Sequence, residues 1–247
     1  MTYCVGIKTH QGLVMASDSR SNAGYDQVNV CRKMYTFVKP GERAFSVLTS
    51  GSLSLTQSTM TLMRRDFNAG NGLATAPTFY DAVRVIGSYV RQVEEMDRVA
   101  LEKDDFRFNI HLLVGGQIKG EDPQLYLIYP QGNPLVVTNE TPFLQIGEYK
   151  YGRPILERGI VYAQTTLESA AMYALLSFDA TMRSNVTVGP PIEMLLYRNN
   201  QLEFDEYRCF NADDPQLHSI HGQWERALRS AVEALPEIEF NACLPNT

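Results

Sequence analysis

The sequence predicts an α+β fold with mainly antiparallel sheets. Strand patterns and helix patterns come in blocks: hairpins first, then two helices, more strands, a helix, a hairpin and a last helix. Such blocks are typical of α+β domains, because parallel α/β folds alternate one strand with one helix. No linker or low-complexity stretch interrupts the 247 residues. We therefore expect a single domain over residues 1–247, with helices on both sides of two stacked sheets.

The first quarter of the chain predicts β-structure. Apolar and polar residues alternate in short runs that are separated by turn residues such as Gly12 and Pro40-Gly41. The expected strands cover residues 2–7, 13–16, 34–38 and 44–48. A polar loop is expected at residues 17–24, after a hairpin formed by the first two strands.

The apolar period then changes to that of a helix. Residues 52–68 form one predicted helix, entered from Ser50-Gly51. Pro77-Thr78 begins a second, which runs to about residue 102, and Thr78 with Asp81 has the spacing of a capping box.

The second half of the chain predicts strands, two more helices and a hairpin. Thr165 and Glu168 form a capping-box pattern before one helix, and Asp214-Pro215 has the chemistry of a helix start before the other. The expected strands here cover residues 109–114, 125–129 and 135–138, with a hairpin of residues 192–197 and 202–204.

Composition and charge exclude several classes of protein. The net charge is −6 and the charges are interspersed, so no basic stripe indicates nucleic-acid binding. No window has the roughly 18 apolar residues of a membrane span, and no signal peptide is apparent. Cys4, Cys31, Cys209 and Cys243 form no C-x-x-C pair, so we expect no metal site. The expectation is a cytoplasmic protein with reduced thiols and no cofactor.

Three residues near the start of the chain form a candidate catalytic group. Removal of Met1 would give Thr2 a free α-amine beside its own hydroxyl, which is a nucleophile with its own general base. Asp18 follows the second predicted strand, so the hairpin returns it to Thr2. Lys33 precedes the next strand, where its ammonium would favour deprotonation of the hydroxyl and Asp18 would offset its charge.

An acyl-transfer reaction at Thr2 also needs a donor for the oxyanion. Ser50-Gly51 stands at the turn from a strand into the first helix. A helix start has free N–H groups and glycine permits close approach, so Ser50-Gly51 is the best candidate for the donor.

Together these segments resemble a proteasome β-subunit, and more closely the bacterial Anbu branch, the ancestral β-subunit. The detailed resemblance covers about the first 60 residues, and the order of elements extends it. The matching runs are Thr2-Tyr3-Cys4-Val5-Gly6, Gly12-Leu13-Val14-Met15-Ala16-Ser17-Asp18-Ser19-Arg20, Arg32-Lys33-Met34 and Thr49-Ser50-Gly51.

The resemblance implies a four-layer αββα sandwich of the N-terminal-nucleophile hydrolase type. By resemblance Thr2 is the nucleophile, Asp18 and Lys33 support it, and Gly51 binds the oxyanion. The backbone around Arg20 and Asn22 would pair with an extended peptide or amide substrate. The family also implies self-assembly into a ring-like or helical homo-oligomer, and it leaves an ATP-dependent partner open.

The chain departs from the family pattern in places. Lys33 lies one residue closer to Thr2 than expected, which predicts a deletion in the loop from residue 22 to residue 30. Glu148 stands where proteasome-type sites carry a serine after a glycine. The family's Asp-x-x-Ser has several candidate matches, which are Asp179, Ser184, Asn185 and Thr187.

Two other functions remain open beside a peptidase. One is a specialised amidase of the same fold that works with a peptide ligase. The other is a non-catalytic scaffold that retains the fold and the assembly surfaces. The charged pair Asp18 and Lys33 favours an enzyme, because a scaffold does not need a charged pair at that position.

Overall fold

The computed structural model describes residues 2–22, 28–103 and 108–240. The chain divides into two compact units, Met1–Ala212 and Asp213–Thr247, and each is described by itself. The single domain over 1–247 stays a prediction.

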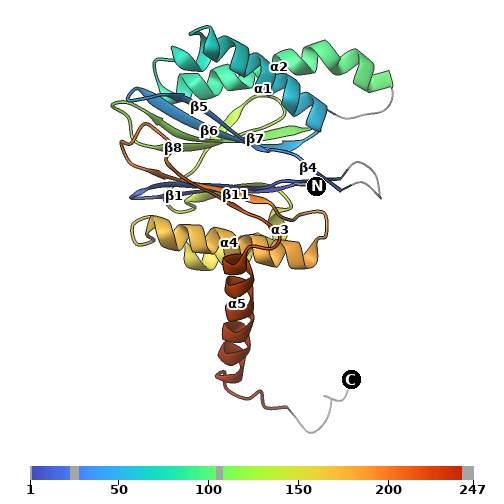
Figure 1. The fold of residues 1–247 in the computed structure, drawn as a ribbon, viewed down its shortest axis with the longest axis vertical. Helices are drawn as coiled ribbons and strands as arrows, with labels where there is room; N and C mark the ends of the chain where they lie inside the picture. Colours follow the sequence, from blue (N-terminus) through green and yellow to red (C-terminus); the bar gives the residue numbers. More distant parts are fainter. Residues whose placement is uncertain (1, 23–27, 104–107, 241–247) are drawn as a thin grey trace, which may run out of the picture. The chain divides into compact units, whose positions relative to one another are not determined.

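The first unit consists of four layers, helix, sheet, sheet and helix (Figure 1). Two five-stranded sheets stack face to face, and a pair of helices covers the outer face of each. The αββα sandwich expected from the sequence is therefore confirmed.

One sheet has the strand order β10-β1-β2-β11-β12, and all its pairings are antiparallel. It will be called the N-terminal sheet, since it contains the first two strands. Its strands are β1 (Tyr3–Thr9), β2 (Gly12–Asp18), β10 (Phe143–Gly147), β11 (Ile192–Arg198) and β12 (Glu206–Phe210).

The other sheet, called the central sheet, has the order β5-β6-β7-β8-β9 and is also antiparallel. A separate two-stranded ribbon joins β3 (Arg20–Asn22) to β4 (Val28–Val30). The central strands are β5 (Met34–Lys39), β6 (Arg43–Gly51), β7 (Ile110–Ile118), β8 (Gln124–Ile128) and β9 (Pro134–Val136).

Helices α1 (Leu53–Asn68) and α2 (Phe79–Lys103) cover the central sheet, and α3 (Tyr149–Gly159) and α4 (Leu167–Ser184) cover the N-terminal sheet. A short 3₁₀ turn, Gly72–Ala74, precedes α2. Both predicted helices of the first half are confirmed, and Thr78 accepts a hydrogen bond from the Asp81 N–H at 3.1 Å.

The strand period of two produces two apolar cores. In β6, Phe45 and Val47 pack towards α1 and α2, whereas Ala44 and Leu48 pack between the sheets. Side chains of one strand point alternately to opposite faces, so β5, β6, β7 and β8 each contribute to both cores. Burial on both faces holds the ends of β1, β2 and β6 rigidly together, and these ends carry the candidate site.

Several elements differ from the prediction. The loop expected at 17–24 contains β3, and residues 23–27 of the expected deletion lie outside the described residues. Strand β10 and helix α3 had no predicted counterpart, and α3 contains Pro154, which is unfavourable inside a helix. The hairpin partner predicted at 202–204 is wrong: β12 lies at Glu206–Phe210.

The N-cap of helix α4 lies one residue later than predicted. Thr166, and not Thr165, is the N-cap and accepts a hydrogen bond from the Ser169 N–H at 3.2 Å. The Thr165 hydroxyl instead accepts from the Val161 N–H at 2.9 Å. The two adjacent threonines have the same cap chemistry, so only the tertiary contact decides between them.

The second unit contains α5 (Pro215–Glu233). Asp214 caps it by accepting hydrogen bonds from the N–H groups of Gln216 and Leu217, as the Asp-Pro pattern predicted. No described helix of the chain is both long and apolar enough to cross a membrane.

Candidate active site

Asp18 and Lys33 form a buried ion pair at one end of the two sheets. Asp18 is the last residue of β2, and Lys33 directly precedes β5. The Lys33 ammonium lies 2.6 Å from Asp18 Oδ1, and their side chains are 7% and 0% exposed. The same ammonium donates to the Arg20 carbonyl at 2.6 Å. The Lys33 ammonium thus has two acceptors, and the ion pair has almost no contact with water.

The β1–β2 hairpin brings the start of the chain to Asp18. Cys4 pairs with Ser17 in the register of this hairpin, so Thr2 and Asp18 lie at the same end. The Tyr3 N–H donates to Asp18 Oδ1 at 3.0 Å. Asp18 therefore connects the backbone next to Thr2 with the Lys33 ammonium. Thr2 is itself buried, at 8% exposure. Met1, whose removal would free the Thr2 amine, lies outside the described residues.

The turn from β10 into α3 covers the backbone of Thr2. The Glu148 N–H donates to the Thr2 carbonyl at 2.8 Å. A Cβ atom on Gly147, which has φ +84°, would lie 1.8 Å from the same carbonyl oxygen. Only glycine permits this approach, so Gly147 is a site residue that the sequence analysis did not single out. Its signal was the glycine before Glu148, a pattern interpreted only for the glutamate.

Glu148 lies at the site as the resemblance implied. It is the N-cap residue of α3, and its carboxylate lies 3.8 Å from the Lys150 ammonium. The Glu148 side chain is 15% exposed. The Glu148 backbone therefore adjoins Thr2 at the position where the family pattern has a serine.

Burial dominates the electrostatics of Asp18. Removal from water raises the pKa of its carboxyl group, and the charge and hydrogen bond of Lys33 act against this rise. Its second oxygen, Oδ2, is buried and has no hydrogen-bond partner in the described part of the chain. The ammonium is the main group that keeps a carboxylate at this position.

Gly51 ends β6 directly before α1. Its φ is +116°, and a Cβ atom there would lie 2.2 Å from the Asn109 carbonyl oxygen. The Ser52 side chain does not cap α1, so it leaves the first N–H groups of the helix without a side-chain acceptor. The Thr49 N–H donates to the Lys33 carbonyl at 3.0 Å, which fastens this end of β6 to the ion pair.

Arg20 and Asn22 lie in β3, whose backbone pairs with β4 on one side. The ribbon has two strands, so the other edge of β3 pairs with no strand in the described residues. The Arg20 guanidinium donates to the Val186 carbonyl at 2.6 Å and packs against Gly189. Its side chain thus fastens β3 to the segment after α4, while its backbone lies beside the site.

The structure around the end of α4 does not select among the candidate residues for the Asp-x-x-Ser pattern. Asp179 and Ser184 lie on α4, and the Asn185 side chain accepts from the Thr187 N–H and hydroxyl at 3.0 and 2.6 Å.

The sequence analysis did not single out Tyr3 as a polar group near the site. Its buried hydroxyl donates to Ser177 at 3.0 Å, and the Gln145 amide donates to it at 2.6 Å. These partners are too distant in sequence for any spacing to indicate them.

The described cysteines do not have the environment of a nucleophile. Burial raises the pKa of the Cys4, Cys31 and Cys209 thiols, so each is held in its unreactive form. Among the described residues, no group of three or more His, Cys, Asp or Glu side chains is placed to hold a metal ion.

His111 is half-buried between the sheets, where burial lowers its pKa. It lines a cavity of about 710 Å³ together with Ser50 and Gly147. Its ring meets the Tyr129 ring edge-on, with centroids 6.4 Å apart. Arg153 lines the same cavity, so the surroundings of the ring include a cation.

Three comparisons with known proteins were made. No family model matches the chain, and no curated protein matches it. Solved structures match it closely over almost the whole chain.

A mutant Anbu (Gly-1) from Hyphomicrobium sp. strain MC1 is 39% identical, with a TM-score of 0.91 over 97% of this chain and 100% of the other. Anbu (ancestral beta-subunit) from Yersinia bercovieri is 38% identical, with a TM-score of 0.90 over 97% of this chain and 100% of the other. The Anbu complex from Pseudomonas aeruginosa, solved as a helical assembly, is 41% identical, with a TM-score of 0.90 over 96% of this chain and 98% of the other.

Proposed function

Since the chain belongs to the Anbu family of proteasome-like β-subunits, we propose that it is an N-terminal threonine hydrolase of peptide or amide bonds. The observation that carries the proposal is the shared acceptor Asp18 Oδ1. It binds the Tyr3 N–H at 3.0 Å and the Lys33 ammonium at 2.6 Å. This single oxygen ties a buried positive charge to the residue that follows Thr2.

In the proposed reaction the Thr2 hydroxyl oxygen attacks the carbonyl carbon of an amide. Its proton passes to the α-amine of the same residue, which has an unperturbed pKa of roughly 7.7 to 8.0. The amine then returns the proton to the leaving nitrogen as the C–N bond breaks. An ester between Thr2 and the acyl group remains, and water hydrolyses it with the amine again as base.

Lys33 and Gly51 have separate roles in this proposal. The buried ammonium stabilises the alkoxide character of the attacking oxygen, and Asp18 holds the ammonium in place. The backbone N–H of Gly51 stabilises the oxyanion of the tetrahedral intermediate. The free edge of β3, formed by Arg20 and Asn22, pairs with the substrate backbone, which suits peptides of many sequences.

Self-association into a ring-like or helical homo-oligomer in the cytoplasm is part of the proposal. The Pseudomonas aeruginosa relative forms a helical assembly, and 41% identity over nearly the whole chain supports the same behaviour here. An ATP-dependent unfoldase partner is a separate expectation, which a degradation assay with and without such a partner would test.

Glu148 supports a second candidate, a specialised amidase that works with a peptide ligase. Its N–H donates to the Thr2 carbonyl at 2.8 Å, so the residue adjoins the nucleophile. The candidate requires that its carboxyl group reach the Thr2 amine. A carboxylate there changes the proton balance of the Thr2 amine and selects among substrates by charge. This candidate predicts turnover of one amide and no cleavage of unfolded proteins.

The test is reaction of intact, untagged protein with an epoxyketone, followed by mass measurement. The reagent needs the amine and the hydroxyl of the same residue. We expect loss of Met1 and one adduct per chain, which Thr2→Ala abolishes and Thr2→Ser retains. Thr61→Ala, at an exposed position on α1, is the matched control. Retained Met1, or a trimmed Thr2 that stays inert, would favour the non-catalytic scaffold.

A further inference from the structure

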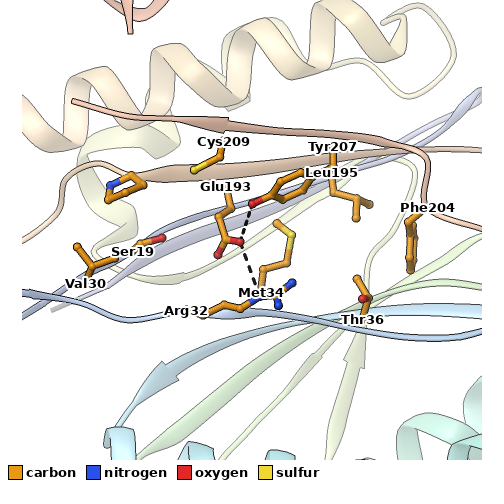
Figure 2. Close-up of a pocket in the computed structure, with 11 residues that line it drawn as sticks. Ser19, Val30, Arg32, Met34, Thr36, Glu193, Leu195, Phe204, Tyr207 and Cys209 are labelled. Carbon is orange, nitrogen blue, oxygen red and sulfur yellow. Dashed lines mark hydrogen bonds and ion pairs between the residues drawn. The ribbon is translucent and has the colours of Figure 1, made fainter. Parts of the chain in front are cut away.

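A second cavity lies between the two sheets, away from the one that His111 lines. It has a volume of about 480 Å³. The start of β5 forms one wall and the hairpin of β11 and β12 forms the other (Figure 2). Met34, Leu195 and Phe204 supply apolar surface, and Tyr207 supplies an aromatic ring with a hydroxyl group. We call this cavity the Glu193 pocket, after the one carboxylate that lines it.

Glu193 is a buried carboxylate without a full set of partners. Its side chain projects from β11 into the space between the sheets and is only 9% exposed. Oε1 accepts a hydrogen bond from the Tyr207 hydroxyl at 2.8 Å. Oε2 is buried and has no hydrogen-bond partner in the described part of the chain. An ionised carboxylate in this state has lost its hydration without full replacement, which is unfavourable.

The neighbouring cation does not compensate for this charge. Arg32 Nε lies 3.8 Å from Glu193 Oε1, which is beyond hydrogen-bond distance, and its side chain is 62% exposed (Figure 2). The Lys33 ammonium, one residue further along the chain, is bound to Asp18 and the Arg20 carbonyl. An exposed guanidinium at 3.8 Å interacts weakly, because water screens it.

The thiol, phenol and hydroxyl groups around Glu193 carry no charge. In the register of the sheet, Cys4, Ser17, Glu193 and Cys209 lie in one row across four strands. Burial and the nearby Glu193 carboxylate both raise the pKa of Cys209, and they do the same for Tyr207. The Ser17 hydroxyl is buried and makes no hydrogen bond within the described residues. The row therefore presents a single negative charge to the pocket.

We propose that the Glu193 pocket binds an ammonium or guanidinium group, with Glu193 as its counter-ion. Such a group places a full positive charge against the carboxylate, and its alkyl stem packs on Met34 and Leu195. The faces of Phe204 and Tyr207 add attraction for a cation. The ligand is a free polyamine or the lysine or arginine side chain of a peptide, since both have this chemistry.

The test measures binding in the full-length Thr2→Ala variant, so its result does not depend on the proposed hydrolase activity. The probe is n-butylammonium, and the matched neutral probe is n-butanol, which has the same stem. Saturation-transfer NMR titrations should give saturable binding of the cation and no saturable binding of the alcohol. Glu193→Gln should weaken binding of the cation roughly tenfold or more. Glu203→Gln, which removes an exposed carboxylate before the same strand β12, should leave it unchanged.

A second variant keeps the proposal falsifiable if Glu193→Gln fails to fold. Arg32 lines the pocket and carries the same charge as the ligand, so Arg32→Gln should keep or raise the affinity for n-butylammonium. Equal binding of the alcohol, unchanged affinity in Glu193→Gln, or a lowered affinity in Arg32→Gln would overturn the proposal. Competition by spermidine but not by N-acetyl-lysine methylamide would identify a polyamine, and the reverse would identify a peptide side chain.

Discussion

Two buried carboxylates lie on neighbouring strands of the N-terminal sheet but differ in their ion-pair partners. Asp18 pairs with Ile192 in the sheet register, and Glu193 pairs with Ser17. Their side chains are 0% and 9% exposed. Asp18 has a buried ammonium at 2.6 Å, whereas the nearest guanidinium of Glu193 is exposed and lies 3.8 Å away. The burial of a carboxylate alone therefore does not show whether its charge has a partner.

The difference follows from which side chain of the segment entering β5 each carboxylate meets. Asp18 meets Lys33, whose ammonium is buried. Glu193 meets Arg32, whose guanidinium is largely exposed. Glu193 also lines a cavity. We infer that the first carboxylate belongs to a completed site and the second to a site that a ligand completes.

The largest expected effect is the loss of the Asp18 partner. Lys33→Met leaves a buried carboxylate uncompensated, which should reduce the free energy of unfolding by about 3–5 kcal/mol. Lys39→Met is the control, because Lys39 forms an exposed pair with Glu42 at 2.9 Å. That change should cost about 0–1 kcal/mol in the same urea titration. Similar losses in both variants would contradict the difference between the buried and exposed pairs.

Tyr207→Phe should have the next largest effect, since it removes the hydroxyl donor of Glu193. Hydrogen bonds to charged groups contribute about 1.5–3 kcal/mol, and the exposure of Tyr207, 50%, reduces this. We expect a loss of about 1 kcal/mol in the free energy of unfolding. In a Glu193→Gln background the same change should cost less, because the acceptor is then neutral. An undiminished loss there would show that the hydroxyl stabilises the fold in another way.

Glu193→Gln tests the comparison through the sign of the change in the free energy of unfolding. Removing a buried charge that lacks a partner should leave the free energy of unfolding unchanged or raise it by about 1 kcal/mol. Lys33→Met, which creates such a charge, acts in the opposite direction. The exposed control Glu203→Gln should stay within about 0.5 kcal/mol of the parent chain. A large destabilisation by Glu193→Gln would mean that the carboxylate already has sufficient partners.

The smallest effect concerns His111, which is accommodated between the sheets as a neutral ring. Burial lowers its pKa below the unfolded value of about 6.5. As the pH falls from that value, the unfolded chain binds a proton before the folded chain does, so stability is lost. His111→Gln should reduce the loss between pH 7.5 and 5.5, measured by urea titration. Thr61→Ala, at an exposed position without a titratable group, should reproduce the slope of the parent chain.

Much of the fold could be predicted from the sequence because it depends on local patterns. The change from a period of two to a helical period locates β6, α1 and α2. The sequence analysis did not predict elements that lack a strong local sequence pattern. The five residues of β10 and the proline-containing α3 are stable through tertiary contacts, and so is the register that places β12 at Glu206–Phe210.

The sequence by itself determined the first hairpin, the strands β5 and β6, and the helices α1 and α2. It also determined that the hairpin brings Asp18 to the end of the sheet where Thr2 lies, and that Lys33 meets Asp18 there. Only the tertiary structure decided that Gly147 closes on the Thr2 carbonyl and that Glu193 faces a cavity with an incomplete set of partners. Hairpin geometry acts over a few residues and leaves a readable pattern. Contacts such as Tyr207 with Glu193 or Gly147 with Thr2 join segments whose sequences carry no mark of each other, so packing alone brings them together.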